Sequence, residues 1–185
     1  MHADPQLTFS ETGPDEPMRF NTLNEWLAWQ EGLHYPSIEL GLDRCMMVAR
    51  RMDLLRPDYA VISVAGTNGK GSSVNFLNSI LKHAGYVTGS YTSPHLIRYN
   101  ERICLNGNEV SDAMLCAAFN RVDQARGDIS LTYFEFGTLA ALDIFQRSGV
   151  EIAILEVGLG GRLDAVNCLD EEVPAQGRRE VAGIQ

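Results

Sequence analysis

The stretch Gly66-Thr67-Asn68-Gly69-Lys70-Gly71-Ser72 follows an apolar run at residues 59–65 and precedes a helical pattern. A strand that leads through a glycine-rich turn into a helix N-terminus forms a cradle for phosphate, because its N–H groups and the helix dipole attract anions. The Lys70 ammonium can neutralise phosphate oxygens. A lone glycine-rich turn is often only a tight connection, but this one predicts binding of a nucleoside triphosphate.

Strands and helices alternate along the rest of the chain. Strands are expected at 59–65, 86–92 and 151–157, and the first is nearly all apolar, as in a parallel strand covered on both faces. Helices are expected from a Thr22-to-Glu25 capping box onward and at about 42–54, 72–84, 111–125 and 134–147, with a hairpin at Asn106-Gly107. The alternation predicts a doubly wound α/β domain with a mostly parallel sheet.

Each expected strand ends in a group that could bind a ligand. The first strand leads to the phosphate loop, the second to Ser93 and the third to Glu156. Ligands of such sheets collect beyond the carboxyl ends of the strands, so the three groups should converge. A glutamate at a strand end is more often a solvated charge. Here the glycines of 158–161 favour close approach of a ligand, and a hydroxyl and a carboxylate suit Mg²⁺.

Four motifs follow one another in the order and spacing of a single family. They are Gly66 to Ser72, Tyr91-Thr92-Ser93-Pro94-His95-Leu96, Leu131-Thr132-Tyr133-Phe134-Glu135 and residues 155–164. On these motifs the chain resembles bacterial dihydrofolate synthase/folylpolyglutamate synthase of the Mur ligase superfamily, over about residues 20–170. The resemblance implies that ATP phosphorylates the carboxylate of dihydropteroate or a folate, and that the amine of L-glutamate attacks the acyl phosphate.

The resemblance also implies ATP and Mg²⁺ as cofactors and assigns residues to them. Lys70 would be catalytic through charge neutralisation, Ser93 and Glu156 would bind the metal, and His95 receives no role as a ligand. An aromatic ring and a hydroxyl at 132–134 could grip a flat heterocycle, and Asp164 could accept hydrogen bonds from the amino groups of a pterin. The implied ATP-binding residues are Thr67, Asn68, Gly69, Lys70, Gly71 and Ser72, and the implied substrate-binding residues are Ile38, Leu40, Thr132, Phe134, Leu163, Asp164 and Ala165.

Composition sets limits on partners and location. The chain has 185 residues, 45% of them hydrophobic, and a net charge of −9, which disfavours nucleic acid and anionic membrane surfaces as partners. Its four cysteines form no C-x-x-C pair and suggest reduced thiols. Neither a signal peptide nor an apolar run of about 18 residues is present. We therefore expect a cytoplasmic protein that acts on small molecules, as a monomer.

The chain departs from the family toward its end. We expect a mobile leader at 1–19, a partial ATP-binding domain at 20–170 and a divergent tail at 171–185. The family's later metal-site histidine and its C-terminal domain have no counterpart, and Val181 would stand where the family has a modified lysine. The expectation is an incomplete ligase. A non-catalytic remnant that at most binds nucleotide is the alternative, and a cell-wall Mur ligase fits residues 132–135 less well.

Overall fold

The computed structural model describes residues 18–33, 42–158, 164–169 and 178–181. The expected helices and strands are present, with ends shifted by at most three residues. The elements are α1 (Leu23–Gly32), α2 (Asp43–Arg51), β1 (Ala60–Val64), α3 (Lys70–His83), β2 (Thr88–Tyr91), η1 (Tyr99–Arg102), β3 (Ile103–Leu105), β4 (Asn108–Glu109), α4 (Asp112–Arg126), α5 (Tyr133–Arg147), β5 (Ile152–Glu156), η3 (Ala165–Leu169) and β6 (Arg178–Val181).

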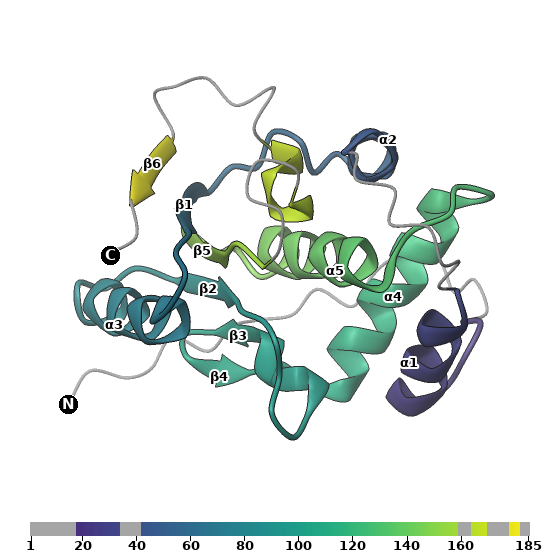
Figure 1. The fold of residues 1–185 in the computed structure, drawn as a ribbon, viewed down its shortest axis with the longest axis horizontal. Coiled ribbons are helices and arrows are strands. Elements are labelled where there is room, and N and C mark those ends of the chain that lie inside the picture. The colour runs from purple at the N-terminus through teal and green to yellow at the C-terminus, as the bar shows by residue number, and fades with distance from the viewer. Residues whose placement is uncertain (1–17, 34–41, 159–163, 170–177, 182–185) are drawn as a thin grey trace.

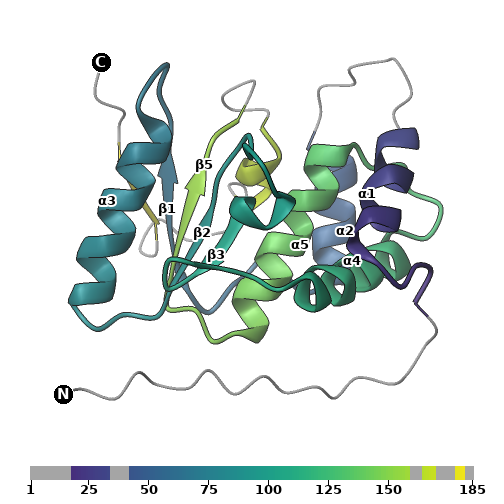
Figure 2. The ribbon, with the colours of Figure 1, turned by 90° about the horizontal axis from the view of Figure 1, so that it is seen from below.

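The sheet has the order β4-β3-β2-β5-β1-β6. Strands β2, β5, β1 and β6 run parallel, and β3 and β4 form the antiparallel hairpin expected at Asn106-Gly107. Helix α3 covers one face, while α5 covers the other and is backed by α4, α2 and α1 (Figures 1 and 2). The mostly parallel α/β architecture is therefore confirmed.

Each face of the sheet has its own apolar cluster. Val64 and Ile154 pack with Val74 of α3 in the smaller cluster. The larger cluster lies between the sheet and α5 and extends to α1, α2 and α4, with Phe136 and Phe145 fully buried. Because β1 contributes Val61 to the larger cluster and Val64 to the smaller one, this strand is covered on both sides, as its apolar run predicted.

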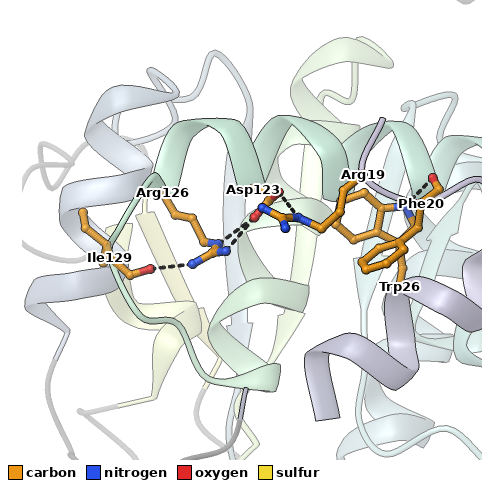
Figure 3. Close-up of polar contacts among 6 residues, drawn as sticks. All are labelled: Arg19, Phe20, Trp26, Asp123, Arg126 and Ile129. Atoms are coloured by element: carbon orange, nitrogen blue, oxygen red, sulfur yellow. Dashed lines mark hydrogen bonds and ion pairs between the residues drawn. The ribbon is translucent and has the colours of Figure 1, made fainter. Parts of the chain in front are cut away.

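The N-terminal helix α1 is fixed to α4 by an aromatic and ionic contact (Figure 3). Trp26 is fully buried and donates from Nε1 to the carbonyl of Phe20 at 3.2 Å. Asp123 accepts from Arg19 Nε at 2.7 Å and from Arg126 Nη2 at 2.7 Å, and both guanidinium groups lie over the ring of Trp29. The chain is thus attached to the domain from Arg19 onward.

Helix α3 begins at Lys70, two residues before the position expected from the sequence. Gly69 is the N-cap and takes a left-handed conformation with φ of 75°, which glycine adopts without steric cost. The apolar pattern located only the buried stripe of the helix. The start was wrong because it depends on that glycine conformation, and the correction places the Lys70 backbone in the first helical turn.

Strand β6 was not expected, since Arg178-Arg179-Glu180-Val181 contains no apolar run. It pairs in parallel with β1, where Val61 is opposite Arg178 and Val64 is opposite Val181. Backbone pairing along the free edge of β1 therefore recruits a segment that side-chain patterning does not identify.

Gly89 in β2 is a position where any side chain would be too large. A Cβ added there would lie 2.6 Å from Cδ1 of Phe145, which is fully buried. Gly89→Ala is therefore expected to lower the free energy of unfolding by about 1–3 kcal/mol, measured by urea denaturation. Gly32→Ala is the control, because nothing lies within 4 Å of its added Cβ. An unchanged free energy of unfolding in Gly89→Ala would show that Phe145 can move aside.

Candidate nucleotide and metal site

The carboxyl ends of three parallel strands converge, as expected from the sequence. Glu156 ends the central strand β5 and is paired in register with Val64 at the end of β1. Its Oε2 accepts a hydrogen bond from the Ser93 backbone N–H at 3.2 Å, and its Oε1 lies 3.8 Å from Lys70 Nζ. Glu156 is 5% exposed, so its carboxylate is buried between the phosphate loop and the loop that follows β2.

The phosphate loop holds its lysine through a backbone carbonyl. Lys70 Nζ donates to the carbonyl of Gly66 at 3.1 Å, so the side chain folds back over its own loop. Residues 65–69 are exposed, and Ser72 is also exposed in the first turn of α3. The loop therefore presents backbone N–H groups at a helix N-terminus to solvent, an arrangement that suits a phosphate group.

The oxygen groups at this edge fit a hard cation. Mg²⁺ is usually bound through one or two protein oxygens, together with phosphate oxygens and waters. Ser93 offers a hydroxyl and Glu156 a carboxylate, and within the described residues no three His, Cys, Asp or Glu side chains gather into a metal cage. Ser93 and Glu156 could therefore provide two of the oxygen ligands of such an ion.

His95 follows Ser93 and the cis peptide bond to Pro94. Its Nδ1 accepts a hydrogen bond from Arg102 Nε at 2.7 Å. Burial and the neighbouring guanidinium lower the pKa of His95, because both disfavour its protonated form. The ring is then a neutral acceptor near pH 7, and it ties the loop after β2 to η1.

Residues expected to bind the pterin substrate meet beyond the end of β5. A Cβ added at Gly158 would lie 3.1 Å from Phe134 Cζ and 3.3 Å from Asp164 Oδ2, so both side chains border the same glycine. Phe134 also packs against the ring of Tyr91, with centroids 5.9 Å apart. These contacts place Phe134 and Asp164 side by side.

The remaining expected substrate residues have different positions. Thr132 is the N-cap of α5, where its hydroxyl accepts from the Glu135 N–H at 3.2 Å, and Ala165 is buried at the start of η3. Asp164 already accepts from the Val166 N–H at 3.1 Å. Ile38, Leu40 and Leu163 lie outside the described residues.

The sequence reasoning did not identify Glu101 and Arg102, which hold the loop carrying Ser93. Arg102 is 9% exposed, lies over the rings of Tyr99 and Tyr133, and hydrogen-bonds to His95. A Glu-Arg pair before a short strand reads as an ordinary charged turn in the sequence. Its contacts depend on the return of the chain from η1 to the end of β2.

All four cysteines are unpaired, in agreement with the expectation of free thiols. In the described part of the chain, none of the helices combines the length and apolar composition needed to cross a bilayer.

Several proteins of known function are similar to this chain in sequence. No family model matches the chain. It is 50% identical over 157 residues to dihydrofolate synthase/folylpolyglutamate synthase of Escherichia coli, covering 85% of this chain and 37% of that protein. It is 48% identical over 151 residues to the Haemophilus influenzae protein of the same name, covering 82% of this chain and 34% of the relative. The chain therefore spans little more than a third of the length of these relatives.

Solved structures agree with the sequence comparison. E. coli FolC in complex with DHPP and ADP has a TM-score of 0.80 and 50% identity, covering 84% of this chain and 37% of that one. The Yersinia pestis bifunctional enzyme complexed with AMPPNP and Mn ion has a TM-score of 0.79 and 51% identity, covering 84% and 38%. In sequence and in fold, the chain corresponds to the N-terminal part of bifunctional dihydrofolate synthase/folylpolyglutamate synthase.

Proposed function

We propose that this chain provides the ATP- and Mg²⁺-binding edge of a ligase that joins L-glutamate to dihydropteroate or to a folate. The convergence of Lys70, Ser93 and Glu156 at the carboxyl ends of β1, β2 and β5 carries the proposal. Relatives bound to ADP, or to AMPPNP and Mn, support a nucleotide and a divalent metal as its ligands. The cytoplasmic location and the monomeric state stay predictions from the sequence.

The chain's own residues would bind and position the nucleotide. The backbone N–H groups of 67–72 and the α3 N-terminus face the phosphates, and the Lys70 ammonium neutralises oxygens on which charge develops during transfer. A magnesium ion held by Ser93 and Glu156 would neutralise further phosphate charge. Phosphoryl transfer needs little else from a protein than positioning and electrostatic stabilisation.

The acid substrate would bind next to this edge. Phe134 offers an aromatic face and Asp164 a carboxylate, and both border Gly158, two residues after Glu156. A flat heterocycle with amino groups suits that pair, because it can stack on one and donate to the other. Its carboxylate would then extend toward the phosphate loop, where an acyl phosphate can form.

Glu156→Gln is expected to abolish the increase in nucleotide affinity that Mg²⁺ provides. The substitution keeps the shape of the side chain, but it removes the negative charge that a divalent cation requires. Isothermal titration of AMPPNP with and without Mg²⁺ measures the gain. Affinity without metal should not fall, because the backbone of the phosphate loop is untouched and Lys70 loses only its contact with the carboxylate.

Glu109→Gln on β4 is the matched control. Glu109 is an exposed carboxylate at the far edge of the sheet, and its loss should leave the gain unchanged. A Mg²⁺-dependent gain that survives Glu156→Gln would mean that the ion is held elsewhere. Binding of AMPPNP and Mg²⁺ without ligase turnover would favour a nucleotide-binding remnant.

A further inference from the structure

The loop between β2 and η1, residues 92–98, carries Ser93 to the candidate metal site. Its outer part has almost no apolar packing, because Leu96 is 90% exposed and Ile97 is 87% exposed. Burial of side chains therefore contributes little to its conformation. Polar contacts have to hold this part of the loop.

Glu101 provides those contacts. Its Oε2 accepts a hydrogen bond from the Leu96 N–H at 2.7 Å, and its Oε1 accepts from the N–H groups of Ile97 and Arg98 at 2.8 and 2.6 Å. One carboxylate thus fixes three consecutive peptide groups. Hydrogen bonds to an ionised carboxylate are shorter and stronger than neutral ones. The donors at Leu96 and Arg98 lower the pKa of Glu101, which keeps it ionised.

Arg102 holds the inner part of the same loop. Its carbonyl accepts from the Thr92 N–H at 2.9 Å, and its Nε donates to His95 Nδ1 at 2.7 Å. Thr92 and His95 flank the Ser93-Pro94 pair on either side. The adjacent residues Glu101 and Arg102 therefore fix the loop from Thr92 to Arg98, and within it the Ser93 N–H reaches Glu156 at 3.2 Å.

We propose that Glu101 is a positioning residue for the metal and nucleotide site: its carboxylate fixes the 92–98 loop so that Ser93 stays beside Glu156. The importance of this placement for metal binding rests on the function proposed above. The effect of Glu101 on the loop itself does not. Its action is indirect, because the three amide groups occupy its oxygens.

Glu101→Gln tests the effect on the loop. Glutamine has one acceptor oxygen and places an NH₂ group against backbone donors, so at least one of the three hydrogen bonds is lost. Arg98 makes the loop a trypsin site. Cleavage after Arg98, followed by mass spectrometry, is expected to become about tenfold faster in Glu101→Gln, since losing a charge-assisted hydrogen bond favours local opening. Glu109→Gln on the neighbouring hairpin should cleave at the wild-type rate.

Nucleotide titration tests the effect on the site. In Glu101→Gln, the Mg²⁺-dependent gain in AMPPNP affinity is expected to fall by about tenfold, while affinity without metal stays within about twofold of wild type. A purely structural defect would weaken both affinities together. A loss confined to the Mg²⁺-dependent gain therefore distinguishes positioning of the metal site from general destabilisation.

Several results would overturn the proposal. Equal cleavage after Arg98 in wild type and Glu101→Gln would show that the carboxylate does not hold the loop. An unchanged Mg²⁺-dependent gain, or an equal loss with and without metal, would show that the loop does not position the metal site. If wild type shows no Mg²⁺-dependent gain, the proposed metal function fails, and the cleavage assay still decides whether Glu101 fixes the loop.

Discussion

Trp26→Ala is expected to lower the free energy of unfolding by about 3–5 kcal/mol, the range found for large aromatic side chains removed from a core. Trp26 is fully buried, packs edge-on to Phe20 at 5.3 Å and contacts Phe119 and Phe136. Its indole N–H also gives α1 a hydrogen bond to the chain that enters it. Urea denaturation followed by circular dichroism measures the loss.

Trp29→Ala is the matched control on the same helix. Trp29 is only half-buried, and its ring faces the guanidinium groups of Arg19 and Arg126, so its removal leaves a surface hollow that water can fill. Its cost should be clearly smaller than that of Trp26→Ala. Equal effects would show that α1 is held by the ionic contact with Asp123 rather than by the buried indole.

Lys70→Ala is expected to weaken nucleotide binding by about 2–4 kcal/mol, because it removes a charged donor and leaves phosphate oxygens without their partner. That loss corresponds to roughly 30-fold to 1,000-fold in affinity. Lys70 is held in place by the Gly66 carbonyl and faces the phosphate loop, so little reorganisation is needed when phosphate arrives. Isothermal titration of AMPPNP in the presence of Mg²⁺ measures the change.

Lys82→Ala removes the same charge from the other end of α3. Lys82 Nζ donates to the Asn106 carbonyl at 3.0 Å, far along the helix from the phosphate loop, and its loss should leave affinity unchanged. Equal affinities for wild type and Lys70→Ala would contradict the assignment of the phosphate loop. If Lys70→Ala and Lys82→Ala lose the same affinity for AMPPNP, the effect comes from the change in net charge and not from a contact between Lys70 and phosphate.

The sequence predicted the features that local chemistry controls. Thr22 forms the expected capping box that begins α1, and Asn106-Gly107 forms the expected turn between β3 and β4. The convergence of Lys70, Ser93 and Glu156 was predicted as well, because parallel strands place their carboxyl ends at one edge of the sheet. These predictions needed only spacing and the direction of the strands.

Other features depend on contacts between distant segments. Strand β6 forms through backbone pairing with β1, which its charged sequence does not indicate. The three hydrogen bonds that the Glu101 carboxylate accepts require η1 to turn back toward β2. The hydrophobic periodicity of the sequence does not predict that turn. The side-by-side placement of Phe134 and Asp164 likewise depends on how α5 packs beside the end of β5.

The contact between Lys70 and Glu156 would couple nucleotide binding to metal binding at the proposed site. Lys70 Nζ lies 3.8 Å from Glu156 Oε1, so an ammonium group neutralises the carboxylate that is proposed to hold the metal ion. If the phosphates of a nucleotide bind Lys70, Glu156 loses its counter-charge. A divalent cation bound to Glu156 would replace that positive charge. Each ligand then raises the affinity for the other by the same factor, because coupling between two binding equilibria is reciprocal. On the proposed function, we therefore expect nucleotide and metal to bind together more tightly than either one binds alone.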